Sequence, residues 1–309
     1  MADSDLSILE PIVIDDAALT STTAPENDYS AYNPATTYAV GDKVIVISTH
    51  SIYESQLAGN TGNDPTDIEN RTGPTIWWLK VGATNAWKMF DEETSSQTVI
   101  ASPLTVVIKP DVFFSALTLF GVRADTVTVI EKDAPGGNIV FNKTYDMENS
   151  RPGDWYEYFF SAFDPQTDLV VDDLIPRITG EITITFTSSG NVACGALNLG
   201  ILNRLGSTAQ TPVSIPKTFS HIEIDKWGNN KIVHRNSAKD ITNIRALVDL
   251  SDANEVVRLL TCVLDKPVPV IVSPRPEYSG VRTIGLVTGA LEYDKPKHCT
   301  LKMNVRGLI

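Results

Sequence analysis

The chain has 309 residues, which is long enough for two or three domains with cores of their own. Hydrophobic residues make up 42% and charged residues 20%, the proportions of an ordinary soluble globular protein, and no apolar run approaches the roughly 20 residues that span a bilayer. The formal net charge of −13 makes nucleic acid and anionic membranes poor partners, although solubility alone also explains such acidity.

Residues 1–30 are expected to form an N-terminal arm and a linker. The segment LSILEPIVI at 6–14 reads as a short strand, and STTAPEN at 21–27 has the composition of a linker. The arm either docks on a neighbouring subunit or packs on its own domain, and the sequence leaves both open. Its acidic start lacks the basic and apolar parts of a secretory signal, so we expect synthesis in the cytosol.

Residues 31–90 read as a small β module. Gly41 and Asp42 predict a tight corner, because glycine reaches backbone angles that a Cβ forbids. The β-branched residues Val44, Val46 and Ile52 indicate two strands after that corner. Aromatic residues bracket these strands and are expected to staple the module: Tyr32, Tyr38, Tyr53, Trp77, Trp78 and Trp87.

An ordered motif in this module resembles the chitin-binding type 3 modules of carbohydrate-binding families five and twelve, over roughly a fifth of the chain. The motif consists of Thr36, Thr37, Tyr38, Gly41, Asp42, Val44, Tyr53, Pro65 and Trp77. In that family exposed aromatic rings stack on sugars, and such modules recur in phage tail proteins. The resemblance therefore implies four candidate glycan-contact residues: Tyr32, Tyr53, Trp77 and Trp78.

One departure from the family pattern concerns its pair of adjacent tryptophans. Gln56, Leu57 and Ala58 stand where the pair follows the tyrosine that corresponds to Tyr53. Either the Trp77–Trp78 pair replaces the sugar platform, or these rings close the core of the module. The sequence leaves both interpretations open.

Residues 91–205 read as a β-sandwich. Leu104, Val106 and Ile108 alternate with Thr105, Val107 and Lys109, and the segment at 181–186 alternates most cleanly, as in half-buried strands. Further strands are expected at 116–120, 126–130, 138–141 and 155–160. Short strands joined by turns, without a helical period between them, are typical of a sandwich. Their order resembles galactose-binding-like jelly rolls of the discoidin type, a fold that often binds sugar or calcium at one end.

Four acidic residues gather in a segment of this unit that reads as a loop: Asp164, Asp168, Asp172 and Asp173. A calcium site needs six to eight oxygen ligands at close range, usually from a loop with regularly spaced ligands. This segment lacks such spacing. We therefore interpret it as a solvated acidic loop.

Residues 211–309 read as a β-sheet with one helix. A hairpin is predicted from 221–225 and 231–235, and further strands from 268–273, 283–287 and 298–305. Between them the apolar residues recur at helical spacing and predict one buried face: Val256, Val257, Leu259, Leu260, Val263 and Leu264. Ser251 or Asp252 can cap this helix, and Asp252 with Glu255 has the spacing of a capping box.

This order of hairpin, helix and strands resembles the building block shared by phage tail-tube, distal-tail and baseplate hub proteins. The segments that carry the resemblance are WGNN at 227–230, SDANEVVRLLTCVL at 251–264 and PVPVIV at 267–272. In those proteins the sheets of neighbouring subunits join edge to edge into a ring. The resemblance implies the same use here, and TFSHIE at 218–223 is the candidate edge.

The sequence contains no recognisable catalytic, cofactor-binding or metal-binding motif, so no enzyme activity is expected. His221 and His234 lie on the two arms of the predicted hairpin, which is too few ligands for a metal site. Cys194, Cys262 and Cys299 form no CxxC pair, and we expect buried free thiols.

These observations predict a mostly β, multidomain protein with an arm at 1–30, a carbohydrate-binding-module-like domain at 31–90, a galactose-binding-like β-sandwich at 91–205 and a tail-protein-like domain at 211–309. The function that they favour is a structural component of a phage tail tip or baseplate, made in the host cytoplasm and located in the virion tail. Its expected partners are other copies in a ring, other tail proteins and host surface polysaccharide. The alternatives are a carbohydrate-binding protein that uses exposed aromatics, or an accessory part of a polysaccharide-degrading enzyme.

Overall fold

A computed structural model of the chain describes residues 5–91, 93, 95–148, 155–156, 165–210, 212–218, 220–224, 230–233, 237–273 and 275–308. Most of these residues lie in antiparallel β-sheets, which confirms the predicted mostly β fold class. No helix within the described ranges has the length and apolar character needed to cross a membrane.

The largest sheet has nine strands, in the order β11 (Asp168–Val171), β8 (Ala116–Phe120), β14 (Ala196–Gln210), β1 (Asp5–Pro11), β19 (Val268–Ile271), β20 (Arg282–Glu292), β21 (His298–Gly307), β18 (Ser237–Asp249) and β15 (Val213–Thr218). A five-stranded sheet has the order β10 (Ile139–Asp146), β9 (Thr126–Lys132), β12 (Glu181–Thr187), β7 (Leu104–Ile108) and β2 (Leu19–Thr22). The aromatic module, residues 31–90, holds a three-stranded sheet of β3 (Lys43–Val46), β4 (Ser51–Ser55) and β5 (Trp78–Ala83).

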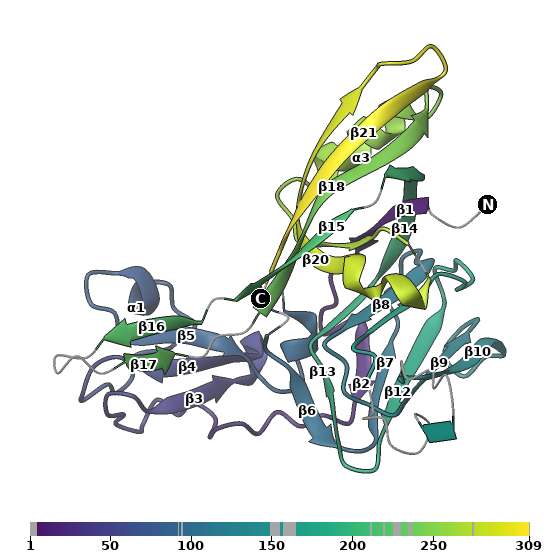
Figure 1. The fold of residues 1–309 in the computed structure, drawn as a ribbon. Coiled ribbons are helices and arrows are strands. Elements are labelled where there is room, and N and C mark those ends of the chain that lie inside the picture. The colour runs from purple at the N-terminus through teal and green to yellow at the C-terminus, as the bar shows by residue number, and fades with distance from the viewer. Residues whose placement is uncertain are drawn as a thin grey trace.

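Two short strand pairs and several helices accompany these sheets in the described ranges. The pairs are β6 (Thr98–Ala101) with β13 (Asn191–Cys194), and β16 (His221–Ile224) with β17 (Asn230–Val233). The helices are α1 (Glu69–Thr72), α3 (Ala253–Val263) and the 3-10 turns η1 (Ile47–Thr49), η2 (Lys88–Phe90) and η3 (Pro276–Val281). Figure 1 shows the aromatic module on one side of the sandwich, while β18, β20 and β21 project away from it.

The β-sandwich forms between the five-stranded sheet and one end of the nine-stranded sheet. β7 and β12 pair antiparallel, and the alternation predicted for both segments is observed, with every second residue buried. The inward residues of β7, β9 and β12 pack against those of β8, β11, β13 and β14 in one apolar core. The period-2 pattern thus placed one face of each strand in the core.

The other end of the nine-stranded sheet closes on itself. β14 also pairs with β18, so β14, β1, β19, β20, β21 and β18 enclose a second apolar core together with α3. Gly206 makes this crossing possible, because its φ is +142° and a Cβ there would lie 2.3 Å from the Leu247 carbonyl oxygen. β14 continues without a break through residue 205, the predicted end of the sandwich unit. The division of the chain into units remains a prediction.

The N-terminal arm belongs to this second core. β1 lies between β14 and β19, with Ile8 opposite Asn203 on one side and Val270 on the other. Leu6 and Leu9 are fully buried. Of the two alternatives left open by the sequence, the arm therefore packs within its own chain. The predicted linker at 21–27 is partly wrong, because its first two residues belong to β2, which pairs with β7.

Helix α3 is the predicted helix, but its buried face is narrower. The buried residues are Ala253, Val256, Leu260 and Val263. Val257 and Leu264 were predicted on the same face and are 43% and 45% exposed, because the helix lies against the sheet along one stripe only. Asp252 stands at the N-cap, yet its side chain makes no capping hydrogen bond and instead accepts one from Ser251 Oγ at 2.9 Å, so the capping-box prediction is wrong.

A buried ion pair joins the sandwich to the closed end of the sheet. Arg282 on β20 and Asp168 on β11 are 2% and 5% exposed, and Nη1 of the arginine lies 2.9 Å from Oδ2 of the aspartate. Arg282 also donates to the Ser273 carbonyl oxygen at 3.1 Å. The predicted solvated loop is therefore wrong at Asp168. Asp173 is half exposed and pairs with Lys143, and Asp164 lies outside the described residues.

Two further predictions need correction. The aromatic segment at 155–160 was predicted as a strand, but Trp155 and Tyr156 are helical and 79% and 72% exposed, while 157–160 lie outside the described residues. All three cysteines are free, as predicted, but only Cys194 and Cys299 are buried. Cys262 is exposed because it falls on the outer face of α3.

Candidate functional site

The aromatic module is built around a small cluster of rings. Its buried core consists of Tyr38, Val44, Tyr53 and Trp78, with Tyr32, Val46 and Trp77 packed against it. The ring of Tyr38 meets that of Trp78 edge to face, with the centroids 5.2 Å apart, and Tyr32 stacks on Tyr38 at 6.0 Å. The predicted corner at Gly41 has φ +87°, and the Asp42 carboxylate accepts from the Ala39 amide.

Of the four candidate glycan-contact residues, two are core residues. Trp78 is 0% and Tyr53 2% exposed, and the Trp78 indole N–H donates to the Asn63 carbonyl oxygen at 2.8 Å. A ring with both faces buried cannot stack on a sugar, so the glycan-contact prediction is wrong for these two. Their burial follows the other interpretation, in which the rings close the core.

The other two candidates, Tyr32 and Trp77, are half-buried at the edge of the cluster. Burial, and next the charge of Asp64, raises the pKa of the Tyr32 hydroxyl. That hydroxyl oxygen is buried and has no hydrogen-bond partner within the described part of the chain. The structure therefore brings all four candidates together, but only Tyr32 and Trp77 are partly exposed to solvent.

Strand β5 carries exposed apolar residues that the sequence analysis did not single out. Leu79 is 53% and Val81 45% exposed, and Ile76 just before the strand is 47% exposed. β5 pairs with β4 on one side and with no other strand in the described ranges. Alternation is the signal for Leu79, because it follows the buried Trp78 in the strand and then points away from the core.

β15 is one of the two edge strands of the nine-stranded sheet, and β11 is the other. Within the described ranges β15 pairs with β18 alone, in a register that places Ile215 opposite Asp240. Val213 is 48% and Ile215 41% exposed. Pro216 lacks a backbone donor and Lys217 pairs with Asp240, so the unpaired ladder is short. The predicted edge at 218–223 is thus displaced, because only Thr218 belongs to β15 and the residues from 221 form the separate β16–β17 pair.

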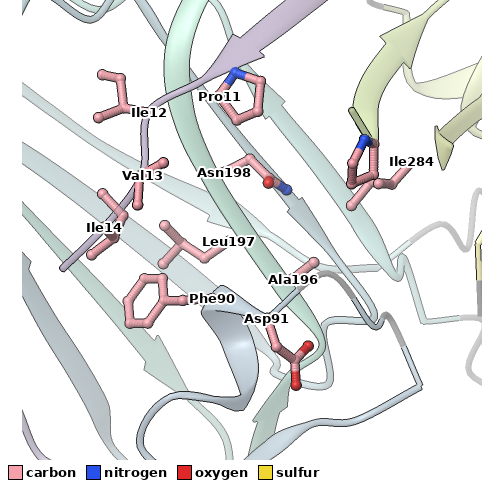
Figure 2. A pocket seen from close by; sticks show the side chains of 11 residues that line it. Pro11, Ile12, Val13, Ile14, Phe90, Asp91, Ala196, Leu197, Asn198 and Ile284 are labelled. Carbon is pink, nitrogen blue, oxygen red and sulfur yellow. The ribbon is translucent and has the colours of Figure 1, made fainter. Parts of the chain in front are cut away.

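A pocket of about 180 Å³ lies where the N-terminal segment meets β14 and η2 (Figure 2). Its wall is mostly apolar and includes Ile12, Ile14, Phe90 and Leu197. Asp91 also lines it, and burial raises the pKa of that carboxyl to about 6. The pocket is small beside the roughly 300–1,000 Å³ of small-molecule sites.

The polar groups of this pocket are mainly engaged in the local fold. The Asp91 carboxylate accepts from the Glu93 amide at 2.9 Å and from the Ser96 hydroxyl. The amide nitrogen of Asn198 is buried without a partner among the described residues. In Figure 2 the Asp91 carboxyl and the Asn198 amide point in different directions, so the two groups do not converge on one position.

Metal ligands and histidines give no further site. Within the described ranges, no three His, Cys, Asp or Glu side chains lie close enough to hold a metal ion. β16 and β17 pair as the predicted hairpin, while His234 lies outside the described residues. No protein-family model matches the chain, and no curated protein matches it.

Proposed function

We propose that this chain is a structural component of a phage tail tip or baseplate, which assembles with copies of itself through the edge of its largest sheet. The observation that carries the proposal is the open edge strand β15, at the end of a nine-stranded antiparallel sheet. An unpaired edge strand presents backbone donors and acceptors that another strand can extend.

The position of β15 suits a specific contact. Val213 and Ile215 add exposed apolar area to the edge, while Pro216 limits the number of backbone hydrogen bonds that a partner can form. A short edge of this kind favours one register over unlimited strand addition. Because the arm β1 is already paired on both sides within its own chain, the edge strand is the better candidate for the contact between subunits.

The resemblances described above extend the proposal to the tail. The hairpin, helix and strand order of residues 211–309 is similar to that of ring-forming tail proteins, and the aromatic module resembles domains that phage tails add to their structural proteins. In this proposal the sheet joins neighbouring subunits and other tail proteins, and the module projects as an attached domain. In this proposal Tyr32 and Trp77, the two partly exposed rings, make any contact with host polysaccharide.

The test is the mass of the purified chain in solution. We expect a multisubunit species by light scattering and a ring in particle images, and we expect Ile215→Lys to weaken the association at least about tenfold, because it places a charge in the contact. Ile139→Lys is the matched control, since Ile139 is 57% exposed on β10, an edge strand of the five-stranded sheet. A chain that stays monomeric at all accessible concentrations, alone and with neighbouring tail proteins, contradicts the proposal.

A further inference from the structure

A cluster of charged side chains connects the aromatic module to the sandwich. His50 lies in the turn between η1 and β4, in a left-handed backbone conformation with φ 47°. Its Nδ1 atom is 2.8 Å from Oε1 of Glu26, and its Nε2 atom is 2.8 Å from Oδ1 of Asp16. The imidazole also stacks on Trp87, with ring centroids 4.0 Å apart and planes at 20°.

Each ring nitrogen of His50 faces one carboxylate oxygen at hydrogen-bond distance. A ring N–H donates and a carboxylate oxygen accepts, so these contacts hold the imidazole between Glu26 and Asp16. The side chains of His50 and Glu26 are 19% and 17% exposed, whereas that of Asp16 is 73% exposed. The contact with Glu26 is therefore less screened by water than the contact with Asp16.

Trp87 links the cluster to the sandwich core, while His50 belongs to the module with its separate core. The Trp87 ring packs against the sandwich core, whereas the turn that carries His50 belongs to the module. The core of the module is a separate cluster, and its three strands pair with no strand of another sheet in the described ranges. The orientation of the module therefore depends on contacts at this junction.

Further bonds tie together the segments that enter and leave the module. Asp28, on the entering side, accepts from the Asn85 amide at 2.9 Å and lies 3.7 Å from the Lys88 ammonium. On the leaving side, the Thr84 amide donates to the His50 carbonyl oxygen at 2.9 Å. Thr84 bonds His50 itself, and Asp28 lies two residues after Glu26, so a change at the imidazole acts on both connections.

We propose that His50, Asp16, Glu26 and Trp87 form a latch that fixes the orientation of the aromatic module on the β-sandwich. While the imidazole is hydrogen-bonded to both carboxylates and stacked on Trp87, both connecting segments are held against the turn of the module. Loss of these contacts releases the module to move about these segments. The inference stands independently of whether the chain assembles as proposed above.

The test is hydrogen exchange of His50→Gln, which keeps a polar side chain but removes the imidazole between the two carboxylates. We expect the Thr84 and Asn85 amides to exchange about tenfold faster, because a charge-assisted hydrogen bond is lost at the junction. Amides of β9 and β12 should keep their rates. His298→Gln is the matched control, since it removes a His–Asp contact of the same 2.8 Å length, with Asp249, at the far end of β21.

Two partner variants and one distance measurement sharpen the test. Glu26→Gln should raise exchange at Thr84 and Asn85 more than Asp16→Asn, in the order of their burial. Spin labels at Leu57→Cys and Ile139→Cys, in a Cys262→Ser background, should show a broader distance distribution when His50→Gln is added. If His50→Gln does not fold, Glu26→Gln carries the same readouts.

Three results would overturn the latch. The first is unchanged exchange at Thr84 and Asn85 in both His50→Gln and Glu26→Gln. The second is an equal rise in His298→Gln. The third is an equal rise at β9 and β12, which would mean that the substitution lowers the stability of the whole chain and does not open the junction.

Discussion

The aromatic module and the β-sandwich are both β structures, yet they are stabilised differently. The module surrounds one indole with two tyrosine rings and a valine, on a sheet of three strands. The sandwich spreads its burial over mostly aliphatic side chains from the five-stranded sheet, one end of the nine-stranded sheet and β13. A small core concentrates its stability in single residues, whereas a large core distributes it. A substitution in the module should therefore act locally and strongly.

The largest expected effect is that of Trp78→Ala. The indole is fully buried and its N–H is hydrogen-bonded to Asn63, so its removal leaves a cavity and an unpaired carbonyl. We expect a loss of about 3–5 kcal/mol in the unfolding free energy of the module. Hydrogen exchange should show β3, β4 and β5 losing protection while β9 and β12 keep theirs. Equal loss in all sheets would mean that the module and the sandwich unfold as one unit.

The second prediction makes the same kind of change in the sandwich. Leu119 on β8 is fully buried between the two sheets, and Leu119→Ala should lower the unfolding free energy of the sandwich by about 3 kcal/mol. Because the surrounding core is large, we expect a shifted but still cooperative transition by chemical denaturation. Near-UV circular dichroism of the module aromatics should stay unchanged at a denaturant concentration below that transition. A loss of the module signal at that denaturant concentration would mean that the module and the sandwich do not unfold separately.

The third prediction concerns Asp91, which follows η2 where the chain leaves the module. Burial raises the pKa of this carboxyl to about 6, above its usual 3.8. The folded state therefore binds the proton more tightly than the unfolded chain, and this contribution to stability is lost as pH rises from about 4 through 6.

Asp91→Asn cannot ionise and should escape that loss. Relative to the variant, the unfolding free energy of the native chain should fall by on the order of 1 kcal/mol between pH 4 and pH 7. This value is reduced because the carboxyl is partly exposed to water. Urea midpoints at four pH values measure the difference. Asn keeps an acceptor for the Glu93 amide, so the local turn is retained. If the unfolding free energy of the native chain rose relative to that of the variant as pH rises, the raised pKa of Asp91 would be contradicted.

The smallest expected effect is that of Trp77→Ala, the neighbour of the most sensitive residue. Trp77 is half-buried at the rim of the ring cluster, so its removal should cost less than about 1 kcal/mol. The variant is therefore suited to a chitin pull-down, because loss of binding would report on contact and not on folding. Equal retention of the native chain and Trp77→Ala on chitin would exclude this ring as the glycan contact.

Local patterns predicted the strands well where one face of a sheet is buried. Alternation identified β7 and β12, glycine chemistry identified the corner at Gly41, and helical spacing identified α3. Local patterns predicted the candidate site less well. Nothing local distinguishes Trp77 from Trp78, although one ring is half-buried and the other fully buried. Their difference comes from the register in which β5 pairs with β4, with Trp78 opposite Ser55.

The amino-acid sequence by itself determined the mostly β class, the positions of most strands and the aromatic character of the module, because these follow from residues near one another in the chain. The tertiary structure alone decided which strands meet. It placed β1 between β14 and β19, paired Asp168 with Arg282 across 114 positions, and brought His50 between Asp16 and Glu26. Such contacts depend on sheet order and register, and many distant segments of similar pattern compete for each of them.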